Sequence, residues 1–175
     1  MASATQKKEK DFENHLHVEE SRWFAVYTKY KREKLVQKML QRKGIETYLP
    51  LQKVTRKYVR KVKHLELPLI NCHLFVKIVQ AEYIPVLETE NVIKFVQIAR
   101  NLISIPQREM DIMQRVVGEE YAVTIEPLGL VVGDEVEIIA GSLTGVKGKL
   151  VSTPERKVVV IELESTGFQL RMDVP

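Results

Sequence analysis

The residue types that could do chemistry are few, and their positions do not predict catalysis. The four histidines are His15, His17, His64 and His73, and Cys72 is the only cysteine. Cys72 and His73 are adjacent on an expected strand, so their side chains point to opposite faces and cannot pair as nucleophile and base. We therefore expect Cys72 to have a structural or surface role, and we predict no catalytic residues.

The same inventory predicts neither a cofactor nor a metal site. No Cys/His spacing suits zinc, and no glycine-rich phosphate loop follows an expected strand. A single cysteine excludes an internal disulfide and fits a reducing compartment. No apolar run approaches the roughly 20 residues that span a bilayer, and residues 1–20 lack the apolar segment of a secretory signal. We predict a cytoplasmic protein that is not an enzyme, with a disordered tail over 1–20.

Positive charge is concentrated in one part of the chain. The formal net charge is only +4, but thirteen basic residues lie between Lys29 and Lys63, opposed only by Glu33 and Glu46. Beyond residue 118 the balance turns acidic. This distribution favours a phosphate-facing surface over a merely solvated one. Binding through phosphates would be salt-sensitive and would carry little sequence information.

The stretch VTRKYVRKVKH, residues 54–64, contains five of these cations with apolar residues between them. Valine, threonine and tyrosine favour extended backbone. Read as one strand, it puts one set of side chains on the first face: Val54, Arg56, Tyr58, Arg60 and Val62. The second face then holds Thr55, Lys57, Val59, Lys61 and Lys63. Neither face is apolar, which predicts a protruding arm or a segment that lies against something acidic.

The periodicity of the N-terminal part predicts alternating strands and helices. Strands are expected at 22–30, 45–50, 72–79 and 91–98, and helices at 31–44, 81–90 and 105–118. The order β-α-β-β-α-β plus a trailing helix implies helices on one face of a sheet. Gly44 is placed to end the first helix in a left-handed cap. The first helix has an apolar face of Leu35, Val36, Met39 and Leu40, and the last has a stripe of Met110, Met113 and Val117.

The first strand carries two apolar rows. Trp23, Ala25 and Tyr27 alternate with Phe24, Val26 and Thr28. A sheet covered on one face can bury only one of these rows. The other row is expected to be an exposed apolar patch that binds a protein.

The C-terminal part predicts strands only. After an expected linker at 118–128, four short strands are expected at 133–141, 145–152, 156–165 and 167–172. About 45 residues without a helix are typical of a small barrel of the SH3 type. The third of these strands is rich in β-branched residues, which have low helix propensity, so a β barrel is the expected ground state.

The motifs in this order resemble a known family. WFAVYT, KREKLVQKMLQRKGIETYLP, PLINCHLFVKI and VIKFVQI resemble the N-terminal domain of NusG-type transcription elongation factors. GDEVEIIAGSLTGVKGKLV resembles the KOW motif of their C-terminal barrel. The resemblance implies an α+β fold: a β-α-β-β-α-β sandwich at 21–117, followed by an all-β KOW barrel at 129–175. Its KOW-turn glycines would be Gly133, Gly141, Gly145 and Gly148.

The resemblance also implies a function and its sites. The family binds the clamp helices of the RNA polymerase β′ subunit and the gate loop of the β subunit, and this suppresses pausing. Matching clamp-helix positions are Tyr27, Ile70, His73 and Phe75, and the gate-loop segment runs from Tyr83 to Thr89. Upstream or non-template DNA would be bound by Lys29, Lys31, Lys34, Lys38, Arg56, Lys57, Arg60 and Lys61. The resemblance implies that the barrel recruits a small-subunit ribosomal protein or the Rho factor. We expect the protein to be a monomer.

Two departures from the family indicate a specialised member. Residues 68–73 read PLINCH where the family usually has P-L-F-P-G-Y, and residues 141–143 read GSL instead of G-P-F. The chain is similar here to RfaH and to the UpxY proteins of capsular polysaccharide operons, which are antiterminators of chosen operons. The alternatives are a housekeeping NusG-like factor and a ribosome-associated KOW protein that binds RNA. A docking hollow filled by the chain's own side chains would contradict the clamp-helix prediction.

Overall fold

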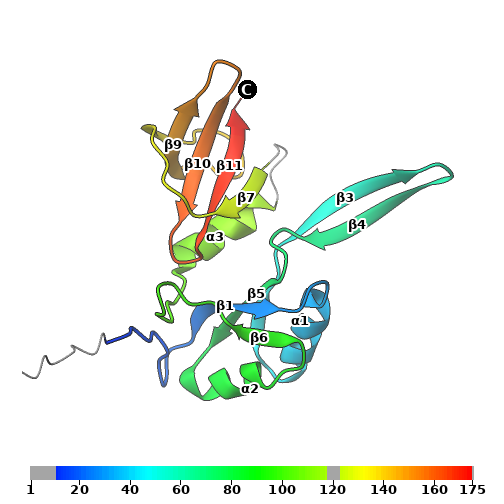
Figure 1. The fold of residues 1–175 in the computed structure, drawn as a ribbon, viewed down its shortest axis with the longest axis vertical. Helices are drawn as coiled ribbons and strands as arrows, with labels where there is room; N and C mark the ends of the chain where they lie inside the picture. Colours follow the sequence, from blue (N-terminus) through cyan, green and yellow to red (C-terminus); the bar gives the residue numbers. More distant parts are fainter. Residues whose placement is uncertain (1–10, 118–122, 175) are drawn as a thin grey trace, which may run out of the picture.

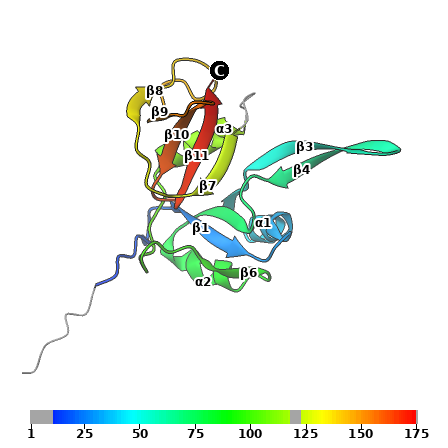
Figure 2. The same cartoon turned by 45° about the horizontal axis from the view of Figure 1, so that its top comes forward.

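The computed structural model describes residues 11–117 and 123–174. Three parts are visible in Figure 1: a mixed N-terminal unit, a long two-stranded arm that leaves it, and a β-rich C-terminal unit above it. The same arrangement is seen after rotation in Figure 2. None of the helices within the described residues is long and apolar enough to cross a membrane.

The N-terminal unit is built on an antiparallel sheet with the strand order β2-β5-β1-β6. Its strands are β1 (Arg22–Thr28), β2 (Glu46–Tyr48), β5 (His73–Ile78) and β6 (Val92–Phe95). The helical elements are α1 (Glu33–Arg42), the 3-10 turn η1 (Gln80–Glu82) and α2 (Tyr83–Leu87). The predicted β-α-β-β-α-β order is therefore confirmed, with an arm inserted between β2 and β5.

One face of this sheet is covered by α1 and α2. Phe24 and Val26 of β1 are fully buried together with Val36 and Leu40 of α1. The predicted apolar face of α1 is confirmed for these two helix residues, whereas Leu35 is exposed. Gly44 follows α1 at φ +79°, in the left-handed conformation expected of a helix cap.

The opposite face of the sheet is buried as well. Trp23 and Ala25 belong to a core that includes α3 (Gln107–Val116) and the C-terminal unit. The indole Nε1 of Trp23 donates a hydrogen bond to Gln107 Oε1 at 3.1 Å. The prediction that one row of β1 forms an exposed patch is wrong, because a second layer covers the face that the helices leave open.

Helix α3 buries more than its predicted stripe. Met110 and Met113 are fully buried as expected, but Val117 is exposed. Ile112 and Val116 are buried in its place. Because apolar residues lie on more than one side of α3, the helix can pack simultaneously against the sheet side and the C-terminal unit.

The C-terminal unit is a five-stranded antiparallel sheet with the order β7-β11-β10-β9-β8, the KOW-like barrel predicted from the sequence. Its strands are β7 (Val123–Pro127), β8 (Asp134–Glu137), β9 (Lys147–Ser152), β10 (Lys157–Leu163) and β11 (Phe168–Val174). The four expected strands and their β conformation are confirmed. Part of the expected linker is instead β7, which pairs with β11, while residues 118–122 lie outside the described residues.

Part of the expected disordered tail is ordered against the N-terminal unit. Residues 1–10 lie outside the described residues. His15 N–H donates to Leu102 O at 2.9 Å, and Leu16 packs against the core between the sheet and its helices. The tail prediction is therefore wrong for residues 11–20, because partners some 90 residues away in the chain hold this segment.

The arm consists of β3 (Leu51–Tyr58) and β4 (Lys61–Pro68), which form a two-stranded sheet of their own. It projects from the body in both views (Figures 1 and 2). The protruding arm is thus confirmed, but the predicted faces are wrong. The chain turns at Val59 and Arg60, so Lys61 lies opposite Tyr58 and Lys63 lies opposite Arg56.

Candidate functional site

The four residues matched to the clamp-helix site meet on the outer face of the N-terminal sheet. Tyr27 of β1 pairs with His73 of β5, and their rings lie 4.7 Å apart at 64°. Phe75 follows on the same strand, two residues along and thus on the same face. Ile70 and Phe75 are buried in one cluster. The structure therefore gathers these side chains into a single, largely apolar surface.

The barrel closes over this surface. The ring of Phe168, the first residue of β11, lies 5.0 Å from the imidazole of His73, at 82°. Burial lowers the pKa of His73, although Nδ1–H donating to Asn71 O opposes that shift. A neutral imidazole suits this position between two rings. In this conformation the expected hollow is filled by the chain's own side chains, so the prediction of an open docking face is wrong for the closed form.

Polar contacts along α3, which we call the α3 clasp, fasten the barrel in place. Ser165 N–H donates to both carboxylate oxygens of Glu109, at 3.1 and 3.3 Å. The Arg115 guanidinium donates to Ser142 O and to Thr144 O, and Ser142 Oγ donates to Arg115 O at 2.8 Å. Burial raises the pKa of Glu109, and the bonds from Ser165 oppose this shift. The clasp is thus polar at its edge and surrounds an apolar centre.

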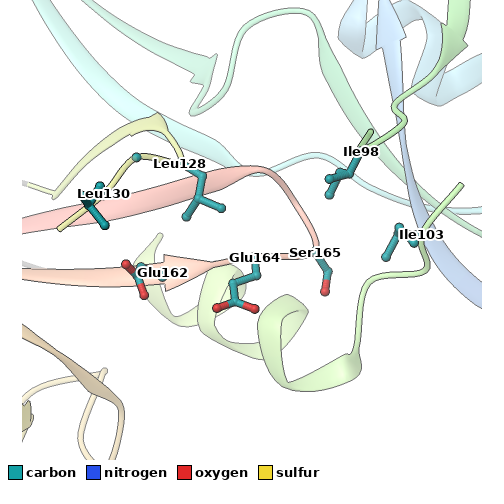
Figure 3. A pocket seen from close by; sticks show the side chains of 8 residues that line it. Ile98, Ile103, Leu128, Leu130, Glu162, Glu164 and Ser165 are labelled. Carbon is teal, nitrogen blue, oxygen red and sulfur yellow. The ribbon is translucent and has the colours of Figure 1, made fainter. Parts of the chain in front are cut away.

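The two units do not meet along their whole boundary. An open hollow of about 690 Å³ lies beside the clasp at Ser165. Figure 3 shows the side chains that line it. Ile98 and Ile103 line it from the N-terminal unit, and Leu128 and Leu130 line it from the barrel side. Leu130 is almost completely exposed, at 96%. The boundary between the units is therefore open at this place.

The KOW-turn glycines shape the barrel. Gly141 and Gly145 lie in the loop between β8 and β9, whose Leu143 is fully buried, and Gly133 precedes β8. A Cβ atom on Gly148 would lie 2.7 Å from Val160 O, closer than packing allows. The loop that departs from the family pattern is the same loop that Arg115 holds through two carbonyl groups.

The predicted gate-loop segment lies in the helical layer, where its Tyr83 and Leu87 line one pocket with Tyr27 of the clamp-helix set. Tyr83 stacks on Phe95, with ring centroids 4.6 Å apart. Thr89 is buried, where its hydroxyl donates to Pro85 O and accepts a bond from Lys43 Nζ, both at 2.9 Å. The Thr89 hydroxyl is therefore committed to local structure, and sequence reasoning gave no sign of the role of Lys43.

The predicted nucleic-acid-binding residues are all exposed and fall into two groups. Lys29, Lys31, Lys34 and Lys38 lie in or just before α1, and Arg56, Lys57, Arg60 and Lys61 lie on the arm. Lys34 Nζ donates to Glu66 O at 2.6 Å, which ties α1 to the base of the arm. Sequence reasoning did not include Lys63 among the sites. Only the pairing of the two strands places it beside Arg56.

The described residues offer no catalytic arrangement around Cys72. Burial, and secondarily the nearby Glu33, raises the pKa of the Cys72 thiol, which disfavours the reactive thiolate. Glu33 Oε1 instead accepts the Cys72 backbone N–H at 2.7 Å, which staples α1 to the start of β5. Within residues 11–117 and 123–174, no three His, Cys, Asp or Glu side chains gather as a metal site would require.

Comparisons with known proteins identify the family. The family model described as transcription termination factor nusG matches residues 21–114. A solved structure concerning domain interaction in Thermotoga maritima NusG superposes with a TM-score of 0.53 at 24% identity. This match covers 88% of this chain and 93% of that chain, which supports the two-unit fold. A search of curated proteins finds no match. The chain belongs to the NusG family of transcription elongation and antitermination factors, which act with RNA polymerase and are regulators rather than enzymes.

Proposed function

We propose that this protein binds the RNA polymerase β′ clamp helices through the face formed by Tyr27, Ile70, His73 and Phe75. The observation that carries the proposal is an apolar sheet face covered by a separate unit of the same chain. Large apolar surfaces on soluble proteins mark binding sites, and here the C-terminal barrel covers such a surface. Bound there, the factor favours the closed clamp and suppresses pausing or termination without doing chemistry itself.

Docking requires the barrel to leave. The aromatic contact between His73 and Phe168 and the α3 clasp occupy the face that the clamp helices would use. The apparent affinity for polymerase is therefore reduced by the small fraction of molecules that are open. A factor of this kind acts where something favours the open form. This supports action on chosen operons, such as those for polysaccharide synthesis, over a housekeeping role.

The remaining surfaces have roles in the same proposal. The α1 lysines and the arm contact upstream or non-template DNA, and the segment Tyr83–Thr89 faces the β gate loop through its exposed atoms. The barrel offers the side chains of Leu130, Val132 and Ile139, which are exposed even in the closed form, to a second partner. That partner is a small-subunit ribosomal protein or Rho, and the complex works in the cytoplasm beside the polymerase.

Binding to purified core polymerase tests the docking claim. The full chain is compared with Arg115→Ala, which removes the bonds to the loop of Ser142 and Thr144. Arg156→Ala is the matched control, because the Arg156 guanidinium pairs with Asp173 on the exposed barrel surface. Arg115→Ala is expected to bind more tightly than the parent, and excess clamp-helix fragment is expected to compete. If the fragment does not displace the opened variant, docking on the clamp helices is wrong.

Run-off transcription separates operon-specific from general action. The full chain is assayed on the leader of its own operon and on an unrelated template. Readthrough confined to its own leader supports the specialised role. Equal stimulation of both templates supports the housekeeping alternative.

A further inference from the structure

The two faces of the arm differ in chemistry once the strand register is known. Residues directly opposite each other in an antiparallel pair share a face. One face of the outer half carries Arg56, Tyr58, Lys61 and Lys63, and we call it the Tyr58 face. The opposite face, which we call the Lys57 face, carries Lys53, Thr55, Lys57, Val62, His64 and Glu66.

The excess of positive charge is larger on the Tyr58 face than on the Lys57 face, where Lys53 and Lys57 stand with Glu66. The three cations of the Tyr58 face have no acidic residue among them, and none forms an ion pair with a carboxylate of the described residues. On the Lys57 face, Lys53 stands opposite Glu66, and Thr55 Oγ1 bonds to His64 Nδ1 at 3.1 Å. Arg56 directly opposite Lys63 is a like-charge pair, which destabilises a hairpin. An anion placed between them would remove that penalty.

The tip of the arm is apolar and uncovered. Tyr58 is 50% exposed, Val59 is fully exposed, and Val62 is 55% exposed. The base, in contrast, is fixed: Val54 and Leu65 are half-buried, and Leu69 N–H donates to Pro50 O at 2.8 Å. A hairpin this long reaches about 25 Å at roughly 3.3 Å per residue. The structure thus presents a supported arm with a basic face and an apolar end.

We propose that the Tyr58 face of the arm binds single-stranded nucleic acid. Arg56, Lys61 and Lys63 contact phosphates, and the ring of Tyr58 stacks on an unpaired base beside Val59. Aromatic residues among cations are the chemistry of single-strand binding, since every base has a face on which a ring can stack. This deepens the proposed function, on which it rests: that function gives the arm upstream or non-template DNA, and the present inference specifies an unpaired strand and adds base stacking on Tyr58.

A single strand fits these observations better than a duplex. A two-stranded β ribbon can enter the major groove, but a duplex presents base edges there and keeps base faces stacked inside. Tyr58 would then have no base face to contact, and its exposed ring would gain nothing from binding. An unpaired base offers its whole face to the ring, and its phosphates stay within reach of the cations behind it.

Fluorescence anisotropy with the full chain tests the proposal. The probes are a labelled oligonucleotide of about 12 nucleotides and the duplex of the same sequence. Tighter binding of the single strand is expected. Tyr58→Ala should weaken it about 5- to 100-fold with the salt slope unchanged, and Tyr58→Phe should retain it. Lys63→Gln should lower the log–log salt slope by about 0.7, while Lys53→Gln, a matched loss of charge on the opposite face, should not.

Several results would overturn the proposal. These are equal or tighter binding of the duplex, a Tyr58→Ala variant with parental affinity, or equal effects of Lys53→Gln and Lys63→Gln. Anionic lipid vesicles are a control, because their charged headgroups and apolar interior could also bind a basic face with an apolar tip. Binding to vesicles but not to the oligonucleotide would also refute the proposal. The clamp-helix fragment is also tested for its ability to displace the same variants from core polymerase. The arm variants should be displaced as readily as the parent. A failure of the arm proposal can then be distinguished from a failure of polymerase docking.

Discussion

The imidazole of His73 on β5 lies edge-on to the ring of Phe168 on β11, with centroids 5.0 Å apart. Tyr27 contacts the same imidazole, with ring centroids 4.7 Å apart. Three rings thus run from the N-terminal sheet into the barrel. Edge-to-face pairs of this kind contribute about 0.5–1.5 kcal/mol beyond their buried area. Single side chains therefore have a measurable influence on whether the chain is closed.

Phe168→Ala is expected to open the barrel, because it removes the only ring that β11 places against His73 among the described residues. Phe168 is half-buried, so the loss of stability should be below the roughly 3–5 kcal/mol of a fully buried phenylalanine. Opening is measured as tighter binding of a clamp-helix fragment to the full chain. Phe168→Tyr keeps the ring and serves as the control. Unchanged fragment binding by Phe168→Ala would contradict the assigned role of this contact.

Glu109→Gln is expected to remove a pH dependence of stability. The folded pKa of Glu109 lies above its ordinary value of 4.5, because burial disfavours the carboxylate. The contribution of Glu109 to the free energy of unfolding is therefore complete below pH 4.5. It is lost as the pH rises through the raised pKa of the folded state. Melting temperatures measured across this window should fall with rising pH more steeply in the parent than in Glu109→Gln.

His73 has the opposite sign and must be separated from Glu109. Burial lowers its folded pKa below 6.5, so its contribution is complete above pH 6.5 and is lost as the pH falls through the lowered value. Subtracting the melting temperature of Glu109→Gln from that of the parent removes the effect of His73, because both proteins retain that residue. If the melting temperatures of the parent and Glu109→Gln differ by the same amount at every pH, then burial does not disfavour the charged form of Glu109.

Thr89→Val tests whether this residue is structural or a polymerase contact. The buried hydroxyl bonds to Pro85 O and Lys43 Nζ, so its loss should cost about 1–3 kcal/mol, as for other buried groups left without partners. Thr89→Ser, which keeps the hydroxyl, should lose much less. Urea unfolding measures the cost. Reduced polymerase binding by Thr89→Val at full stability would instead assign Thr89 to the gate-loop contact.

Gly44→Ala should destabilise the N-terminal unit through backbone strain alone. Gly44 has φ +79°, and a Cβ atom built there meets nothing within 4 Å. The left-handed conformation costs other residues about 1–2 kcal/mol. Gly129→Ala is the control, because that glycine also has open space around it but needs no positive φ. Equal melting temperatures for the two variants would show that the left-handed conformation of Gly44 does not contribute to stability at the end of α1.

Local periodicity predicted the elements well, because burial on one side imposes a period of 2 or 3.6 on the sequence. It mispredicted the arm because the turn at Val59 and Arg60 resets which residues share a face. A strand of the same composition without that turn would have kept Lys63 away from Arg56. The missed β7 is short and contains Glu126 and Pro127, which gave it the composition of a linker.

The candidate site was harder to predict than the fold. The pattern WFAVYT specifies two apolar rows in β1, but nothing within the strand tells whether a polymerase or the chain itself covers the second row. Phe168 lies 95 residues from His73, and Ser165 lies 56 residues from Glu109. Their contacts depend on how the two units are placed. The docking residues, the DNA contacts and the barrel's partner stay predictions.

The separation of 95 residues between His73 and Phe168 has a consequence for biosynthesis. The ribosome completes the N-terminal sheet well before the last strand of the barrel leaves the exit tunnel, at roughly 5–20 residues per second. During that interval Ile70 and Phe75 have no cover from β11, and newly made chains on neighbouring ribosomes can adhere through them. A gene truncated before β7 should therefore yield a self-associating product, and co-expression of the barrel as a separate polypeptide should restore its solubility.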